Sequence, residues 1–124
     1  MNTILVVEDD KLLGKAVAQT LEQAGYKTFW ARDGKEAFEA LGAQKVGMVY
    51  LDLMLPGDMD GYEILRRVKN DEILRDIPVV ILSNLGQMNE IDRAMELGAS
   101  DYLVKANIDL EKLVGLTKEK MLVS

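Results

Sequence analysis

The sequence predicts an α/β domain built on a parallel sheet of five strands, with helices on both faces of the sheet. Two observations lead to this fold class. Short apolar runs alternate along the chain with longer segments of helical period, an order typical of βα units. The apolar runs are also continuous instead of alternating with polar residues, as expected of strands covered on both faces.

The first part of the chain contains two expected strands and two expected helices. The run Thr3–Val7 (TILVV) is rich in β-branched residues and predicts a central strand. Apolar residues recur at helical spacing over Lys11–Ala24, and the glycine that follows is a natural helix stop. Lys27–Ala31 predicts a weaker strand. The segment Asp33–Gly42 then predicts a short helix that opens on Asp-Gly and is closed by its last glycine.

The middle of the chain predicts the third strand and the third helix. The third strand is expected at Val46–Leu51 (VGMVYL), and the polar loop Asp52–Asp60 follows it. The next helix is expected to begin at Gly61 or Tyr62 and to end at Lys69, with its apolar residues on one stripe.

The last part of the chain repeats the pattern twice. Val79–Leu82 (VVIL) predicts the fourth strand, and Gln87–Leu97 predicts a helix with Gly98 as its C-cap. Asp101–Val104 predicts the fifth strand. Asp109 is expected to cap a last helix. The apolar stripe of that helix comprises Leu110, Leu113, Val114, Thr117 and Met121.

Five such units define the expected topology. Right-handed crossovers between parallel strands make this a doubly wound sheet, with five helices and the flavodoxin-like strand order 2-1-3-4-5. A chain of 124 residues fits one ordinary domain, so residues 1–124 are expected to form a single domain.

The composition excludes several classes of function. The chain has no cysteine and no histidine, which removes disulfides, thiolate metal sites and the usual general base. Lys and Arg number 15 against 21 Asp and Glu, for a net charge of −6, so we expect no direct binding to nucleic acid. No apolar run approaches the roughly 20 residues of a membrane span. We therefore expect a cytoplasmic protein without membrane insertion.

Polar side chains gather where the predicted strands end. The first strand is followed by Glu8-Asp9-Asp10, the third by Asp52, the fourth by Ser83 and the fifth by Lys105. Ligands of doubly wound sheets bind at this edge. Neighbouring carboxylates repel one another, and a cluster of oxygen ligands suits Mg²⁺ or Mn²⁺.

Each of these residues also has a simpler interpretation. Asp9 or Asp10 could cap the first helix, Ser83 could cap the fourth, and Lys105 could be a solvated surface charge. The simpler interpretations do not explain why all of them fall at one edge of the sheet. The joint pattern therefore favours a functional site.

The sequence resembles the receiver domain of two-component response regulators over its whole length. The motifs that carry this resemblance are ILVVEDD (Ile4–Asp10), VYLDLMLPG (Val49–Gly57), MDGYEILRRVK (Met59–Lys69), PVVILS (Pro78–Ser83) and LGASDYLVK (Leu97–Lys105).

The resemblance implies a metal site and a phosphoacceptor. Asp52 matches the family's phosphoacceptor aspartate, and it also belongs to the Mg²⁺ site, where Mn²⁺ is an alternative. Asp9 matches the direct carboxylate ligand, and Glu8 matches a second acid that commonly acts through water. The main-chain carbonyl of Met54 matches the family's remaining protein ligand. Asp10 is the odd acid out, and we expect it to serve the start of the first helix.

The resemblance also implies how the signal is received and passed on. Lys105 matches the family's active-site lysine, Ser83 its switch hydroxyl and Tyr102 its switch aromatic residue. The phosphodonor is then a histidine kinase or a histidine phosphotransfer protein, since this chain has no histidine. The output surface is the face formed by helix 4, strand 5 and helix 5, which would bind a downstream protein or a second copy. The only chemistry implied is self-catalysed phosphoryl transfer and autodephosphorylation, so the chain is not expected to be an enzyme.

The sequence departs from the family pattern in three places. The family usually has proline after its lysine, often across a cis bond, whereas Lys105 is followed by Ala106. A cis bond without proline costs ~3–4 kcal/mol, so the loop either takes that cost or follows another path. Asp58 lengthens the loop after Asp52 by one residue. Asn84 replaces a smaller residue and is expected to narrow access to the phosphoryl site.

Three other functions share parts of this pattern. A flavin-binding flavodoxin needs a hydroxyl- and glycine-rich loop after the first strand, where Glu8-Asp9-Asp10 would repel a phosphate. A phosphatase with an aspartate nucleophile normally has a second aspartate two residues later, where this chain has Met54. The serious alternative is a receiver-like protein-binding module that acts without phosphorylation, which the change at Ala106 leaves open.

Overall fold

The computed structural model describes residues 2–84 and 88–122, and it has the predicted five-stranded parallel sheet in the order β2-β1-β3-β4-β5. The strands are β1 (Thr3–Val7), β2 (Lys27–Ala31), β3 (Met48–Asp52), β4 (Val79–Ser83) and β5 (Asp101–Val104). The helices are α1 (Lys11–Gln23), α2 (Gly34–Ala43), α3 (Gly61–Lys69), α4 (Met88–Glu96) and α5 (Leu110–Leu122), with a short 3₁₀ turn, η1, at Lys105–Asn107.

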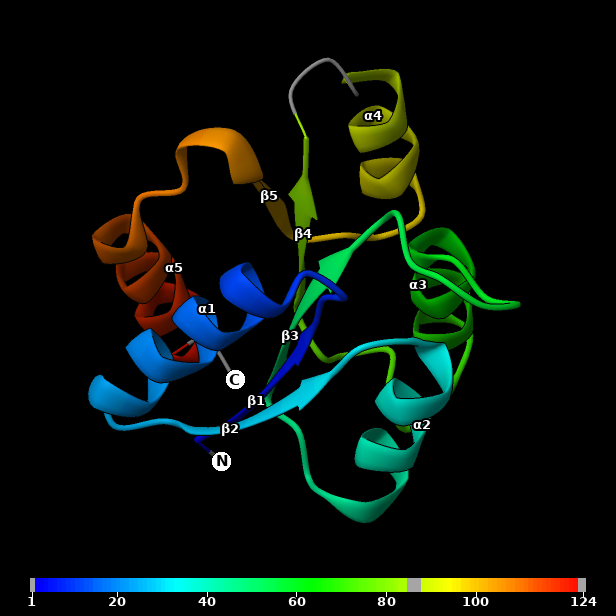
Figure 1. Ribbon diagram of the computed structural model, residues 1–124. Helices are drawn as coiled ribbons and strands as arrows, with labels where there is room; N and C mark the ends of the chain where they lie inside the picture. The colour runs from blue at the N-terminus through cyan, green and yellow to red at the C-terminus, as the bar shows by residue number, and fades with distance from the viewer. Residues whose placement is uncertain (1, 85–87, 123–124) are drawn as a thin grey trace.

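Two layers of helices enclose the sheet. Helices α1 and α5 cover one face, and α2, α3 and α4 cover the other (Figure 1). Successive side chains of each central strand alternate between the two layers. Ile4 and Val6 of β1 face the core under α1 and α5, whereas Leu5 and Val7 face the core under α2 to α4. This double burial explains why the strands are continuous apolar runs.

An aspartate directly precedes four of the helices and caps the N-terminus of each. Asp10, Asp33, Asp60 and Asp109 each accept a hydrogen bond from a backbone N–H in the first turn of the helix that follows. Their side chains satisfy donors that have no partner within the helix. The expected roles of Asp10 and Asp109 as caps are therefore confirmed.

Some predicted boundaries were wrong by one or two residues. Helix α2 continues through Gly42 to Ala43, because Gly42 keeps a negative φ and the amide of Gln44 still donates to the carbonyl of Ala40. Gly25 and Gly98, by contrast, follow α1 and α4 with φ of 101° and 111°. That conformation favours glycine and ends a helix.

The third and fourth strands extend one residue further than predicted. Asp52 pairs with Leu82, and Ser83 pairs with Val104, so both polar residues belong to the sheet itself. The third strand begins at Met48, two residues later than expected. The expected start of the fourth helix at Gln87 lies outside the described residues.

No helix within residues 2–84 and 88–122 combines the length and apolar character needed to cross a membrane.

Candidate functional site

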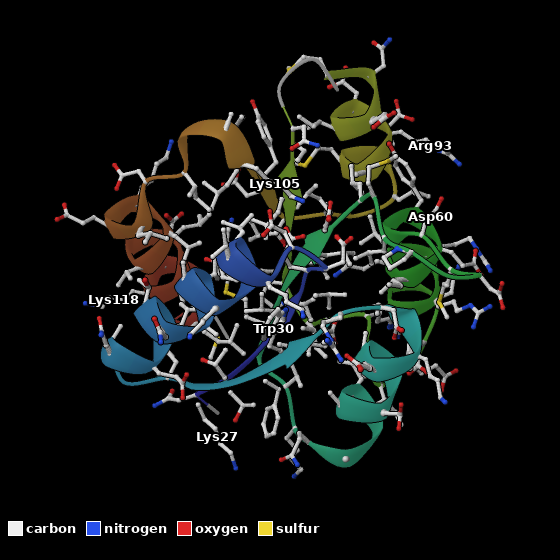
Figure 2. The ribbon with its side chains drawn as sticks, viewed as in Figure 1. Lys27, Trp30, Asp60, Arg93, Lys105 and Lys118 are labelled. Carbon is white, nitrogen blue, oxygen red and sulfur yellow. The ribbon has the colours of Figure 1, made fainter. Side chains whose placement is uncertain are left out.

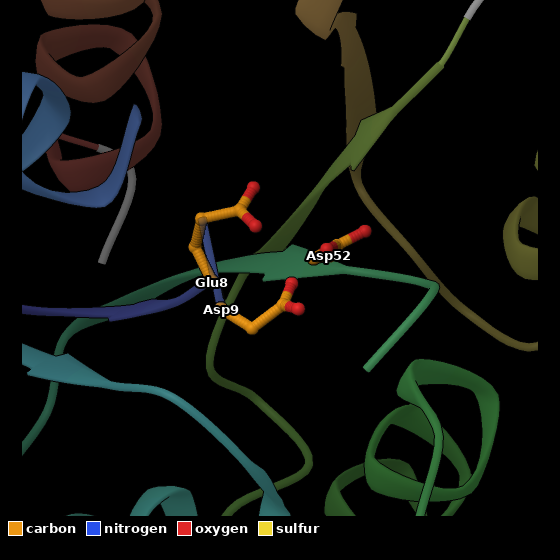
Figure 3. Close-up of side chains that lie close together, drawn as sticks. All are labelled: Glu8, Asp9 and Asp52. Carbon is orange, nitrogen blue, oxygen red and sulfur yellow. The ribbon is translucent and has the colours of Figure 1, made fainter. Parts of the chain in front are cut away.

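Three carboxylates meet at the carboxyl edge of the sheet. Glu8 and Asp9 follow β1, and Asp52 ends β3 (Figure 3). One oxygen from each lies within 4.8 Å of the others. Glu8 and Asp52 are buried, whereas Asp9 is exposed. The sequence-based prediction that these three acids converge is confirmed.

Lys105 reaches this cluster from the end of β5 (Figure 2). Its Nζ lies 2.8 Å from Oε1 of Glu8 and 2.8 Å from Oδ2 of Asp52. Lys105 is the first residue of the 3₁₀ turn η1, and no peptide bond between described residues is cis. The loop therefore takes a path with trans peptide bonds only, and it avoids the cost of a cis bond without proline. Lys105 reaches the acids although Ala106 replaces the family's proline.

Burial and charge shift the pKa values of the groups in this cluster. Burial raises the pKa of Glu8 to about 7, although the ammonium of Lys105 and the amide of Asp10 oppose that shift. The amide of Asp10 donates to Oε2 of Glu8 over 3.1 Å. For Lys105, burial alone lowers the pKa, but its pairs with Asp52 and Glu8 outweigh burial and raise it. The lysine is thus held as a cation between two carboxylates.

Asp52 has a hydrogen bond on its other oxygen. The amide of Met54 donates to Oδ1 of Asp52 over 3.0 Å, while Oδ2 faces Lys105. The side chain of Met54 is exposed. The expected role of its carbonyl as a metal ligand remains a prediction.

Ser83 and Tyr102 lie on the neighbouring strands. Tyr50 and Leu82 face the core under α1 and α5, so alternation turns Asp52 to that side and Ser83 to the side of α4. The Ser83 hydroxyl is buried and has no hydrogen-bond partner among the described residues. The simpler interpretation, in which Ser83 caps the fourth helix, concerns residues 85–87, which lie outside the described residues. Tyr102 lies on β5 with 36% of its surface exposed, at a register position beside Ile81 rather than Ser83.

An open cleft of about 600 Å³ lies over the acids. Its polar lining includes Asp9, Asp52, Asn84 and Lys105, and its apolar lining includes Leu12, Leu13, Met54 and Ala106. Asn84 borders the site, and the expectation that it narrows access to the phosphoryl site stays a prediction. The cleft gives a ligand direct access to Asp52 and Lys105.

Two residues that support the site were not singled out from the sequence. Gly61 begins α3, where an added Cβ would overlap the main-chain oxygen of Asp52, and its amide donates to the carbonyl of Leu53 over 3.0 Å. Trp30 donates from its indole N–H to the carbonyl of Glu8 over 2.7 Å. A glycine directly after a cap residue and the chain's single tryptophan were the only signals available.

The donor set fits a hard divalent cation. Three carboxylates contribute oxygen ligands, and a single ammonium does not balance them. Oxygen-only sites with one or two carboxylates and open positions are typical of Mg²⁺.

Comparison with known proteins identifies relatives of the chain. The family model for the response regulator receiver domain matches residues 4–118. The transcriptional regulatory protein CrdR of Helicobacter pylori is 39% identical over 110 residues, which cover 89% of this chain and 50% of CrdR. The phosphate regulon transcriptional regulatory protein PhoB of Pseudomonas aeruginosa is 37% identical over 103 residues, which cover 83% of this chain and 44% of PhoB. The chain thus spans about half the length of these relatives.

Solved structures agree with this result. The signal receiver domain of a signal transduction histidine kinase from Syntrophus aciditrophicus has a TM-score of 0.89 at 31% identity, with 99% of this chain and 92% of that chain covered. The receiver domain of NtrX from Brucella abortus has a TM-score of 0.91 at 29% identity, with 98% and 99% covered. This chain therefore belongs to the family of receiver domains of two-component response regulators.

Proposed function

We propose that this chain accepts a phosphoryl group on Asp52 in a reaction that depends on Mg²⁺ or Mn²⁺. The observation that carries the proposal is the position of Lys105, whose ammonium lies 2.8 Å from the carboxylate of Asp52 at the floor of an open cleft. A cation beside a carboxylate nucleophile offsets the repulsion that this nucleophile meets when it approaches a charged phosphoryl group.

The proposed reaction is a direct transfer from a phosphohistidine. An oxygen of Asp52 forms a bond to phosphorus as the P–N bond breaks, and the donor imidazole keeps the electron pair of that bond. The groups of this chain that would hold the transferred oxygens are Lys105 and the hydroxyl of Ser83, which has no hydrogen-bond partner among the described residues. Glu8, Asp9, Asp52 and the carbonyl of Met54 would hold the metal ion. When bound, that ion would neutralise part of the phosphoryl charge.

The surroundings of the cleft support a protein as the donor. Leu12, on the first turn of α1, is 85% exposed, and Met54 is 56% exposed; both line the cleft. Exposed apolar side chains that border a polar site are a favourable surface for docking. The donor is a histidine kinase or a histidine phosphotransfer protein, whose phosphohistidine would reach Asp52 through this cleft.

The proposed output surface comprises α4, β5 and α5. A hollow of about 520 Å³ lies along β5 and the start of α5, and it is lined by Tyr102, Val104, Asp109 and Lys112 among others. A downstream protein or a second copy of the chain would bind there. The absence of direct nucleic-acid binding stays a prediction, since relatives such as PhoB are transcriptional regulators and this chain matches about half of their length.

The remaining proposals concern the chain as a whole. We propose that residues 1–124 form one receiver domain that works in the cytoplasm, as response regulators typically do. Its own chemistry is restricted to self-catalysed phosphoryl transfer and autodephosphorylation. The family match excludes the flavodoxin and phosphatase alternatives. The alternative of a module that acts without phosphorylation was left open because Ala106 replaces the proline that usually follows the family's lysine. Lys105 nevertheless reaches Asp52, so this replacement no longer supports the alternative.

Mass spectrometry of the intact protein tests the phosphoacceptor. The chain is incubated with Mg²⁺ and acetyl phosphate, as wild type and as the Asp52→Asn variant. A single phosphoryl adduct is expected on wild type and none on the variant, because the amide is not a nucleophile. Asp33→Asn is the matched control, since asparagine also caps a helix, and it should form the adduct. An adduct on Asp52→Asn, or none on wild type, would contradict the proposal.

A further inference from the structure

The chain's single tryptophan holds the backbone at the acidic site. Trp30 lies on β2, beside α1 (Figure 2). Its indole N–H donates to the main-chain carbonyl of Glu8 over 2.7 Å. On the same residue, the amide of Glu8 donates to the carbonyl of Ala31 over 2.9 Å. Both backbone groups of Glu8, the first residue after β1, are therefore bonded to the neighbouring strand.

The helix above leaves room for this indole. Gly14 lies on α1, and a Cβ added there would come within 2.5 Å of the Trp30 ring. Glycine inside a helix is less favourable than alanine, because it lacks a side chain and leaves the unfolded backbone more freedom. The contact with Trp30 explains why this position is glycine. Gly14 and Trp30 thus form one packing unit that keeps the indole N–H directed at Glu8.

The orientation of the Glu8 carbonyl affects two of the three acids. This carbonyl and the amide of Asp9 belong to one rigid peptide plane. Fixing the carbonyl therefore fixes the direction in which the chain leads to Asp9. It also fixes the backbone from which the buried Glu8 side chain reaches Lys105.

We infer that Trp30 is a positioning residue for divalent-cation binding. It sets the peptide plane between Glu8 and Asp9 so that both carboxylates converge with Asp52 before any ion arrives. This inference rests on the metal site of the proposed function. Without the indole hydrogen bond the peptide plane between Glu8 and Asp9 can rotate. Cation binding must then restore its orientation, which lowers the measured affinity.

Binding of Mn²⁺, measured by electron paramagnetic resonance of the free ion, tests the inference without phosphorylation. Four proteins are compared: wild type, Trp30→Phe, a protein that carries β-(3-benzothienyl)alanine at position 30, and Phe29→Leu. The benzothienyl side chain keeps the shape of the indole but lacks its N–H. Phe29→Leu is the matched control, because Phe29 lies on the same strand and packs against the opposite core cluster.

The two Trp30 replacements are expected to weaken Mn²⁺ binding about three- to tenfold, the effect of losing one hydrogen bond. Phe29→Leu should lower the urea midpoint but leave Mn²⁺ affinity unchanged. Wild-type affinity in the benzothienyl protein would overturn the role of Trp30 and leave the metal site intact. Failure of wild type itself to bind Mn²⁺ would overturn the metal site and this inference together.

Gly14→Ala gives an independent test that keeps the tryptophan. The added methyl group would displace the indole, so this variant should weaken Mn²⁺ binding to a similar degree. In a Trp30→Val background the same substitution meets no ring, and it should leave the Mn²⁺ affinity of that background unchanged. Equal effects of Gly14→Ala in the two backgrounds would contradict the inference.

Discussion

Lys105 pairs with two of the three clustered acids, whereas the third, Asp9, forms no ion pair with any of the described residues. The cluster therefore keeps an excess of negative charge on its exposed side, where the cleft opens. Repulsion between close carboxylates disfavours that arrangement, and a bound cation relieves it. The same carboxylates that favour cation binding therefore lower the stability of the protein when no cation is bound.

Replacing Asp9 separates cation binding from folding. We expect Asp9→Asn to weaken Mn²⁺ binding by more than about 100-fold, because it removes a charged ligand. The urea midpoint should stay the same or rise, since repulsion among the acids falls. Acetyl phosphate should then give no metal-dependent adduct on Asp52. Undiminished phosphorylation of this variant would contradict the assignment of Asp9.

Tyr50 connects the strand that carries Asp52 to α5. Its hydroxyl lies 2.6 Å from the hydroxyl of Thr117 and donates to the carbonyl of Leu113 over 3.1 Å. Tyr50 and Thr117 are both fully buried. Burial raises the pKa of Tyr50 from 10 to about 12, because the phenolate is poorly solvated in the core.

This shift predicts a change of stability at high pH. Between pH 10 and 12 the unfolded chain releases a proton that the folded protein keeps, so the free energy of unfolding falls as pH rises through this range. We expect wild type to lose up to about 3 kcal/mol more than Tyr50→Phe over that range. At neutral pH the variant should be less stable by about 0.5–1.5 kcal/mol. Urea unfolding at a series of pH values measures both effects. If the free energies of unfolding of wild type and Tyr50→Phe fall in parallel between pH 10 and 12, the buried phenol does not cause the loss of stability.

At the level of elements, the strands were predictable and some of their ends were not. Runs such as TILVV at Thr3–Val7 are buried on both faces, so their composition alone indicates a central strand. The predicted end of α2 at Gly42 was wrong. A glycine that ends a helix usually adopts a positive φ, whereas Gly42 keeps a negative φ. That difference depends on the path of the following chain, which local sequence does not specify.

The site was predictable to the same extent and for the same reason. The carboxyl ends of the strands meet at one edge in any parallel sheet, so the sequence alone predicts that Glu8, Asp9 and Asp52 lie together. Trp30 and Gly61 could not be assigned this way. The hydrogen bond of Trp30 joins residues 22 positions apart, and the contact of Gly61 depends on how closely α3 approaches β3.

The close approach of α3 gives a prediction about two glycines. Gly61→Ala should destabilise the protein by about 1–3 kcal/mol, because its methyl group would overlap the backbone of Asp52 and Leu53. Gly115→Ala, within α5, meets no atoms and should stabilise the protein by about 0.5–1 kcal/mol. Urea unfolding of both variants tests the pair. Similar changes in both would show that helix propensity, and not contact with β3, determines the effect at Gly61.

Considered as a whole, the molecule has the proposed phosphoacceptor between its two helical layers. Asp52 shares a strand with Tyr50, which contacts α5, and its neighbouring strand ends in Ser83 on the side of α4. A group bound to Asp52 can therefore influence both layers, provided that it makes different contacts in two arrangements of the chain. The buried hydroxyl of Ser83 has no partner among the described residues, so it is available for such a contact.

We expect a phosphoryl group on Asp52 to gain a hydrogen bond from Ser83 and thereby shift the population of α4 arrangements. Ser83→Ala should still be phosphorylated on Asp52, but binding at the α4–β5–α5 surface should no longer respond. Amide exchange over α4 (Met88–Glu96), with and without beryllofluoride as a phosphoryl mimic, measures the coupling. Wild type should change its exchange rates, and Ser83→Ala should not. Ser100→Ala, a serine outside the acidic cleft, should respond like wild type. An equal response in Ser83→Ala would exclude Ser83 as the switch. The phosphoacceptor assignment would stand, because the contact between Lys105 and Asp52 does not involve Ser83.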